Sequence, residues 1–162
     1  MAILITIPNS VYRKLRERAE KEGVTLEEYL LELIMQDIDP KDRAYDYLEA
    51  SFKLIAQAKK ELESGDLRQA SEKLWGATAF AIKAYAYWKD RRRLTSHREL
   101  WEYSEVVANE LGEWVLVVFE QADSVHKNFY EGWAKKKHVE VALKGVEKFI
   151  EAIARKIKYK AS

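Results

Sequence analysis

The 162-residue sequence predicts a mostly α-helical fold, an up-and-down helical bundle preceded by a short β-strand and two further helices. Three observations support this expectation. Apolar residues recur at helical spacing through most of the chain, glycines and capping residues separate these segments, and only the first residues alternate like a strand. The two parts meet at Asp39-Pro40, where a helix-capping residue precedes the proline favoured at a first helical position.

The first part, residues 1–38, should begin with a strand. Residues 3–7 read ILITI, which alternates with period two, and Pro8 ends the pattern. A helix is expected over residues 10–22, with Asn9 placed to cap it.

A second short helix should follow at once. Gly23 ends the preceding helix, and Thr25 and Glu28 form a Thr-x-x-Glu capping box for a helix that continues to Ile34. One strand and two helices cannot cover their own apolar faces, and a lone strand has no hydrogen-bonding partner. This part is therefore expected to pair with a second copy.

The second part, residues 39–162, should be an up-and-down bundle of five helices. The helix capped by Asp66 and Gln69 is apolar around most of its circumference, so it is expected at the centre, and its Gly76 should mark a close helix contact. The predicted helices run over 41–64, from Asp66 to the charged loop 89–93, from the Ser96 and Glu99 capping box to the break at Gly112, over 114–133, and over 138–158.

Composition narrows the function classes. The chain has 48% hydrophobic residues and no cysteine, so it has ample core but no disulfide or thiolate metal site. No apolar run is long enough to cross a membrane, and we expect a cytoplasmic protein without a membrane partner. Three dispersed histidines predict no metal site and no cofactor. Abundant Lys and Glu are typical of thermophiles.

Charge is unevenly distributed. Residues 1–40 contain five basic and eight acidic side chains, a net charge of −3, which leaves +4 for the rest of the chain. Because lysine and arginine drive most nucleic-acid affinity, this balance argues against strong non-specific DNA binding by the first part alone.

The segment ILITIPNSVYRKLRERAEKEGVTLEEYLLELI resembles the ribbon-helix-helix family. The resemblance implies a dimer whose paired strands enter the DNA major groove, with Ala2, Leu4 and Thr6 facing bases and the residues around Thr25 at phosphates. Only Thr6 of the three strand positions can hydrogen-bond to a base. The residues implied for DNA binding are Leu4, Thr6, Arg13 and Thr25.

Residues 47–157 resemble the HEPN superfamily, and within it the archaeal PaREP family. The resemblance rests on YLEASFKLIAQAKKELESGDLRQASEKLWGATAFAIKAYAYWK, on SHRELWEY and on HKNFYEGW. It implies a helical homodimer, and a setting in which members cut RNA as toxins or act as partners in toxin–antitoxin pairs.

Catalytic HEPN ribonucleases place an arginine a few residues before a histidine, which pairs charge stabilisation with proton transfer. His126 has the matching context, with Tyr130 one turn on, but Glu120 and its neighbours offer no arginine. Arg92 and His97 have a matching spacing, yet His97 follows the helix cap Ser96, which explains the pattern without catalysis.

The charged loop suggests a second kind of site. Basic side chains beside Tyr87 and Trp88 suit RNA or nucleotide binding through phosphate contacts and stacking. The residues concerned are Lys89, Arg91, Arg92, Arg93, His97 and Arg98, together with Tyr130. The alternative is a solvated loop beside core aromatics.

The sequence thus favours a noncatalytic dimeric binding protein of a toxin–antitoxin or defence-like system, which binds DNA, RNA or a cognate toxin or antitoxin protein. One alternative is a HEPN-type ribonuclease that uses His126. The other is a ribbon-helix-helix transcriptional regulator.

Overall fold

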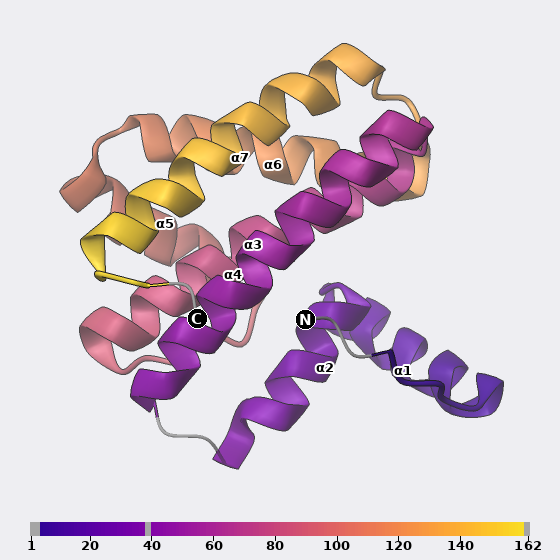
Figure 1. Cartoon of the computed structure of the whole chain (residues 1–162), viewed down its shortest axis with the longest axis horizontal. Coiled ribbons are helices and arrows are strands. Elements are labelled where there is room, and N and C mark those ends of the chain that lie inside the picture. The colour runs from indigo at the N-terminus through magenta and orange to yellow at the C-terminus, as the bar shows by residue number, and fades with distance from the viewer. Residues whose placement is uncertain (1–3, 38–39, 161–162) are drawn as a thin grey trace.

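The computed structural model describes residues 4–37 and 40–160, and every regular element within these ranges is a helix (Figure 1). The elements are α1 (Asn9–Glu22), α2 (Leu26–Ile34), the short 3-10 helix η1 (Met35–Asp37), α3 (Pro40–Ser64), α4 (Leu67–Asp90), α5 (His97–Leu111), α6 (Trp114–Glu131) and α7 (Lys136–Lys156).

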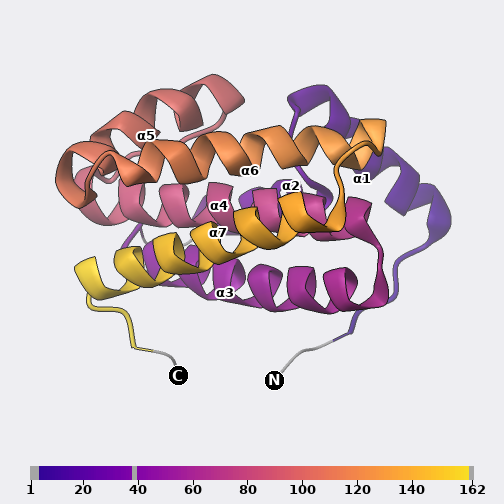
Figure 2. The same ribbon diagram turned by 90° about the horizontal axis from the view of Figure 1, so that it is seen from above.

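The structure confirms the prediction that α4 lies at the centre of the bundle. Figure 2 shows α4 between α3 on one side and α6 on the other, with α7 across α3 and α4. From Ala70 to Tyr87 the side chains of α4 are buried except for the half-buried Lys73. The largest of them, Trp75, Phe80 and Tyr85, are at most 1% exposed. A helix that is apolar around most of its circumference must be enclosed, and α4 is.

The predicted close contact at Gly76 is confirmed. A Cβ atom at this position would lie 3.0 Å from Leu54 Cδ1 on α3 and 3.5 Å from Thr25 Oγ1 at the start of α2. The absence of a side chain lets three helices meet at one point of α4.

The capping residues recognised in the sequence lie at most of the observed helix ends. Ser96 and Glu99 form the predicted capping box of α5, and Gly23 follows α1 in the left-handed conformation with φ of 69°. The structure corrects one cap, because Asn9 is the first residue of α1 and does not cap it. Three ends differ from the prediction by two residues, since α6 stops at Glu131 and α7 runs from Lys136 to Lys156.

The predicted strand at residues 3–7 is wrong for the single chain. Residues 4–8 belong to no strand, and Leu4 and Ile5 are 95% and 77% exposed. The physical reason is that a strand needs a neighbour to satisfy its backbone hydrogen bonds, and the described chain supplies none. Residue 3 lies outside the described residues.

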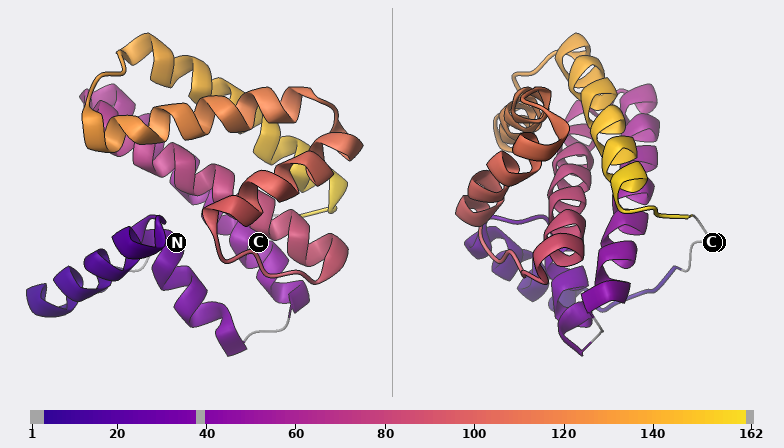
Figure 3. Two further views of the ribbon diagram at one scale, coloured as in Figure 1. Left: turned by 180° about the vertical axis from the view of Figure 1, so that it is seen from behind. Right: turned by 90° about the vertical axis from the view of Figure 1, so that its left-hand side faces the viewer.

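Helices α1 and α2 form a V beside the bundle (Figure 3). They share a small core of their own, formed by Ala19, Val24 and Tyr29 with Leu15 packed against it. Residues 4–37 are called the arm from here on. Among the described helices, none combines the length and apolar character needed to cross a membrane.

Candidate functional site

Two histidines from different helices meet at one buried tryptophan. His97 begins α5, His126 lies on α6, and Trp75 lies on α4. The ring centroid of Trp75 is 5.1 Å from that of His97 and 5.4 Å from that of His126. The fold thereby joins the two histidine-bearing stretches, which are far apart in the sequence.

His97 has two competing hydrogen-bond partners at one atom. Its Nε2 lies 3.0 Å from Asp123 Oδ1 and 3.1 Å from Trp101 Nε1. An indole N–H only donates and an ionised carboxylate only accepts. Unprotonated Nε2 therefore accepts from Trp101, whereas a protonated Nε2 donates to Asp123. The partner of His97 depends on where its proton sits.

His126 is buried and uncharged at neutral pH. Its side chain lies against Trp75 and the edge of Tyr130, and the residue is 9% exposed. Burial lowers the pKa of His126 to about 4; the neighbouring Asp123 opposes this shift, and His97 adds to it. Its Nδ1 has no hydrogen-bond partner among the described residues. Such a group is a weak general base near pH 7.

The basic loop between α4 and α5 does not present a set of free cations. Each predicted basic side chain already contacts a carboxylate or a carbonyl of the same chain. Lys89 pairs with Glu110, Arg91 donates to the carbonyls of Tyr87 and Trp88, Arg92 lies 3.6 Å from Glu99, Arg93 Nε lies 2.9 Å from Glu32, and Arg98 Nε lies 2.8 Å from Glu102. These partners offset the charge available for phosphate.

The residues proposed to bind DNA are divided by the fold. Leu4, Thr6 and Arg13 are exposed. Thr25 is 3% exposed, caps α2 by accepting from the amide of Glu28, and lies against Gly76 of α4. The start of α2 is therefore covered by the bundle and does not present its amides to a phosphate in this arrangement.

A buried ion cluster joins the arm to the bundle. Lys83 Nζ lies 2.7 Å from Glu28 Oε1 and 2.8 Å from Glu32 Oε1. Glu32 also accepts from Tyr47 Oη at 2.6 Å and from Arg93 Nε at 2.9 Å. Lys83 and Glu28 are at most 2% exposed. The cluster holds α2 against α3, α4 and the loop that precedes α5.

In this cluster the basic and the acidic side chains each stabilise the ionised form of the other. Burial alone would lower the pKa of Lys83, but the two carboxylates outweigh it and the pKa is raised. Burial alone would raise the pKa of Glu32, but Lys83, Tyr47 and Arg93 outweigh it and the pKa is lowered. Both groups are therefore charged at neutral pH.

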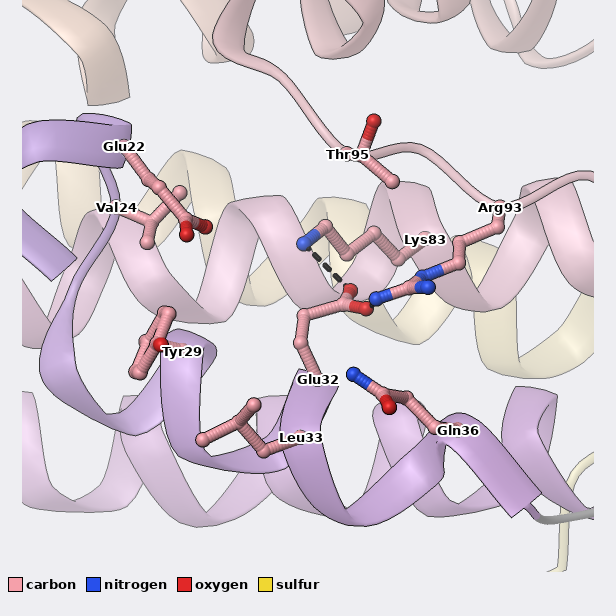
Figure 4. A pocket seen from close by; sticks show the side chains of 9 residues that line it. All are labelled: Glu22, Val24, Tyr29, Glu32, Leu33, Gln36, Lys83, Arg93 and Thr95. Atoms are coloured by element: carbon pink, nitrogen blue, oxygen red, sulfur yellow. Dashed lines mark hydrogen bonds and ion pairs between the residues drawn. The ribbon is translucent and has the colours of Figure 1, made fainter. Parts of the chain in front are cut away.

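A cavity of about 120 Å³ lies beside the ion cluster, between the arm and the bundle (Figure 4). Lys83 and Glu32 lie on one side of it, Tyr29 on the other, and Arg93 and Thr95 come from the loop. The full lining is Glu22, Val24, Tyr29, Glu32, Leu33, Gln36, Lys83, Arg93 and Thr95.

Sequence reasoning missed this cluster although a signal was present. Lys83 is the only charged residue between Leu74 and Tyr87, in a stretch of α4 that is otherwise apolar around most of its circumference. A lone lysine in such a helix requires an acidic partner. Glu28 and Glu32, spaced four apart on one face of α2, are the matching pair.

A sequence model of the Archaeal PaREP1/PaREP8 family matches residues 46–150, which covers α3 from its second turn to the last third of α7. No curated protein matches the chain. Within the described ranges, no group of three histidine, aspartate or glutamate side chains is arranged to hold a metal ion.

Proposed function

The chain belongs to the archaeal PaREP1/PaREP8 family, and we propose that it is a noncatalytic, dimeric binding protein with a HEPN-like bundle and a ribbon-helix-helix-like arm. Its arm joins two copies, and the dimer holds a nucleic acid or a cognate protein in a toxin–antitoxin or defence-like system. The observation that carries the proposal is the set of apolar side chains that the arm leaves exposed, both in residues 4–8 and on α1 and α2.

Several apolar side chains of the arm have no cover within the described chain. On α2, Leu33 and Ile34 are 42% and 65% exposed, whereas Glu28 is fully buried. On α1, Val11 and Tyr12 are 43% and 40% exposed. An amphipathic helix normally turns its apolar side inward. Tyr29 of α2 is buried, but Leu33 and Ile34 near its end are not, and these exposed apolar side chains support a second copy as the missing cover.

The extended segment before α1 supports the same conclusion. Ile5 and Ile7 are exposed on one side of residues 4–8. No backbone ladder bond is made by these residues within the described chain. Two antiparallel copies would satisfy each other's amides and carbonyls and would cover the isoleucines.

The histidine cluster supports a noncatalytic bundle. His126 is uncharged and nearly buried, and the preceding turns of α6 hold Phe119, Glu120 and Gln121 in place of an arginine. A carboxylate near that position would repel a phosphate.

The test compares two faces of one segment. Ile5→Lys/Ile7→Lys should give a monomer in sedimentation velocity at concentrations where the wild type is a dimer. Leu4→Lys/Thr6→Lys adds the same charge to the opposite face and should remain a dimer. A dimer that survives both pairs of substitutions would remove the arm from the interface.

One observation favours a second function, RNA cleavage. The His97–Asp123 pair lies beside His126 around Trp75, so two imidazoles could share acid and base roles. This function predicts shortening of single-stranded RNA that is lost in both His97→Ala and His126→Ala. Intact RNA with the wild-type protein would exclude it.

A further inference from the structure

On the side of α2 that faces the bundle, the carboxylates lie against basic side chains of the bundle. All three glutamates of this helix contact basic side chains of the bundle. The pairs are Glu27 with Lys73, Glu28 with Lys83, and Glu32 with both Lys83 and Arg93. Acidic groups and their basic partners thus follow one another along the length of the contact.

The cations form a narrow stripe. Lys73, Gly76 and Lys83 lie on the side of α4 that meets α2. Ten residues of α-helix span about 15 Å. Arg93 extends the stripe beyond the end of α4. We call Lys73, Lys83 and Arg93 the cationic stripe.

The contact between α2 and the cationic stripe has features that favour its opening. Glu28 is fully buried, yet its Oε2 has no hydrogen-bond partner among the described residues. Buried ion pairs contribute little net stability, and an unsatisfied carboxylate oxygen reduces it further. The arm also has its own core, distinct from that of the bundle, which it meets mainly through Leu31 and Met35. Moving α2 away would leave most of the bundle core closed.

We propose that the cationic stripe binds a single-stranded chain of phosphates, and that α2 covers it in the resting protein with carboxylates in the places of phosphates. The arm is then an autoinhibitory cover. This inference rests on the proposed binding function and adds its ligand class and its control, while dimerisation is a separate property.

The ligand chemistry follows from the shape of the stripe. Cations spread over about 15 Å cannot all contact one small anion, so the ligand must carry several charges in a line. The space that α2 vacates has the width of one helix, about 10 Å. A single strand fits such a groove and follows it with its backbone.

The experiment uses the full chain. The released variant is Glu27→Gln/Glu28→Gln/Glu32→Gln, and its control is Glu17→Gln/Glu63→Gln/Glu105→Gln, which makes the same charge change at exposed positions. Fluorescence anisotropy with labelled single-stranded RNA should show at least tenfold tighter binding by the released variant than by the control. Adding Lys73→Gln/Arg93→Gln to the released variant should abolish the gain. Equal affinity of the released variant and the control would overturn the proposal.

A reversible lock tests whether arm movement is the cause. A Cβ atom at position 76 would lie 3.5 Å from Thr25 Oγ1, and the chain has no cysteine of its own. Thr25→Cys/Gly76→Cys in the released variant should therefore form one disulfide across the contact. The oxidised protein should bind RNA like the control, and the reduced protein like the released variant. Identical affinity in both redox states would contradict the masking.

The wild-type protein provides a test that needs no substitution. Saturating RNA should speed amide hydrogen exchange in α2 while it slows exchange around Lys73 and Lys83 in α4. Unchanged exchange in α2 would overturn the proposal. Inorganic polyphosphate serves as the second ligand: equal effects identify phosphate charge as sufficient, and a larger effect of RNA identifies a nucleic acid as the source. Sedimentation of the same samples reports dimerisation independently.

Discussion

The imidazole of His126 stacks on the indole of Trp75, with ring centroids 5.4 Å apart and ring planes inclined by 24°. Helices α4 and α6 place this pair where the histidine is 9% exposed. A protonated imidazole at this position would lose most of its hydration, and burial therefore lowers its pKa to about 4. The protonation of His126 is consequently linked to folding.

This linkage predicts that the folded chain loses stability already at pH values above those at which carboxylates titrate. The folded pKa of about 4 is below the ordinary value of 6.5, so the unfolded chain takes up the proton first as pH falls. The free energy of unfolding should be highest above pH 6.5 and should drop by roughly 2 kcal/mol on going to pH 5. Urea unfolding at both pH values measures the drop.

A matched pair of variants assigns the drop to one histidine. His126→Gln should lose most of the pH dependence between pH 7.5 and 5. His138→Gln, at an exposed position near the start of α7, should retain it. The same slope in wild type and His126→Gln would contradict a neutral, buried His126.

The Lys83 cluster predicts a large cost for removing one charge. Lys83→Met would leave Glu28 and Glu32 beside each other without their cation and should destabilise the chain by about 3–5 kcal/mol. Replacing all three, as Lys83→Met/Glu28→Met/Glu32→Met, should recover most of that loss. Denaturant unfolding of the two variants checks the comparison. A triple variant less stable than the single one would show that the ion cluster is itself a net source of stability.

The structure also explains what the sequence could and could not predict. Helix limits followed from local signals, such as the Ser96 and Glu99 box, because a capping group acts on its own turn. The strand predicted at residues 3–7 is absent from residues 4–7, because no segment of the described chain pairs with their backbone groups. Thr25 was assigned to a phosphate but is buried, since the side of α2 that meets α4 is decided by Glu28 and Glu32, whose pairing with Lys83 is non-local.

The contact of three helices at Gly76 predicts a selective effect of a larger side chain. Gly76→Leu would place atoms where Leu54 and Thr25 now lie. Because the arm is held by fewer apolar contacts than α3, we expect α2 to yield first, with at least tenfold faster hydrogen exchange of its amides. Ala56→Leu, at an exposed position of α3, is the control and should leave α2 protected. Equal protection of α2 in both variants would argue against close packing at this point.

The paired cations in the loop before α5 and in its first turn predict a small effect on nucleic-acid binding. Arg92 and Arg98 already contact Glu99 and Glu102. Arg92→Gln/Arg98→Gln should therefore change the RNA affinity of the wild-type chain by less than about twofold, with an unchanged salt slope. Anisotropy titrations across a salt series measure both quantities. A tenfold loss with a shallower slope would make this loop the RNA-binding surface.

The central claim is that the arm forms a dimer interface, and the molar mass of the protein in solution tests it directly. Sedimentation equilibrium of the wild type should give twice the mass of one chain, and Ile5→Lys/Ile7→Lys should give the mass of one chain with unchanged helix content. A wild-type mass equal to one chain at micromolar concentration would contradict the central claim, as would a dimer that persists when the isoleucines carry charge.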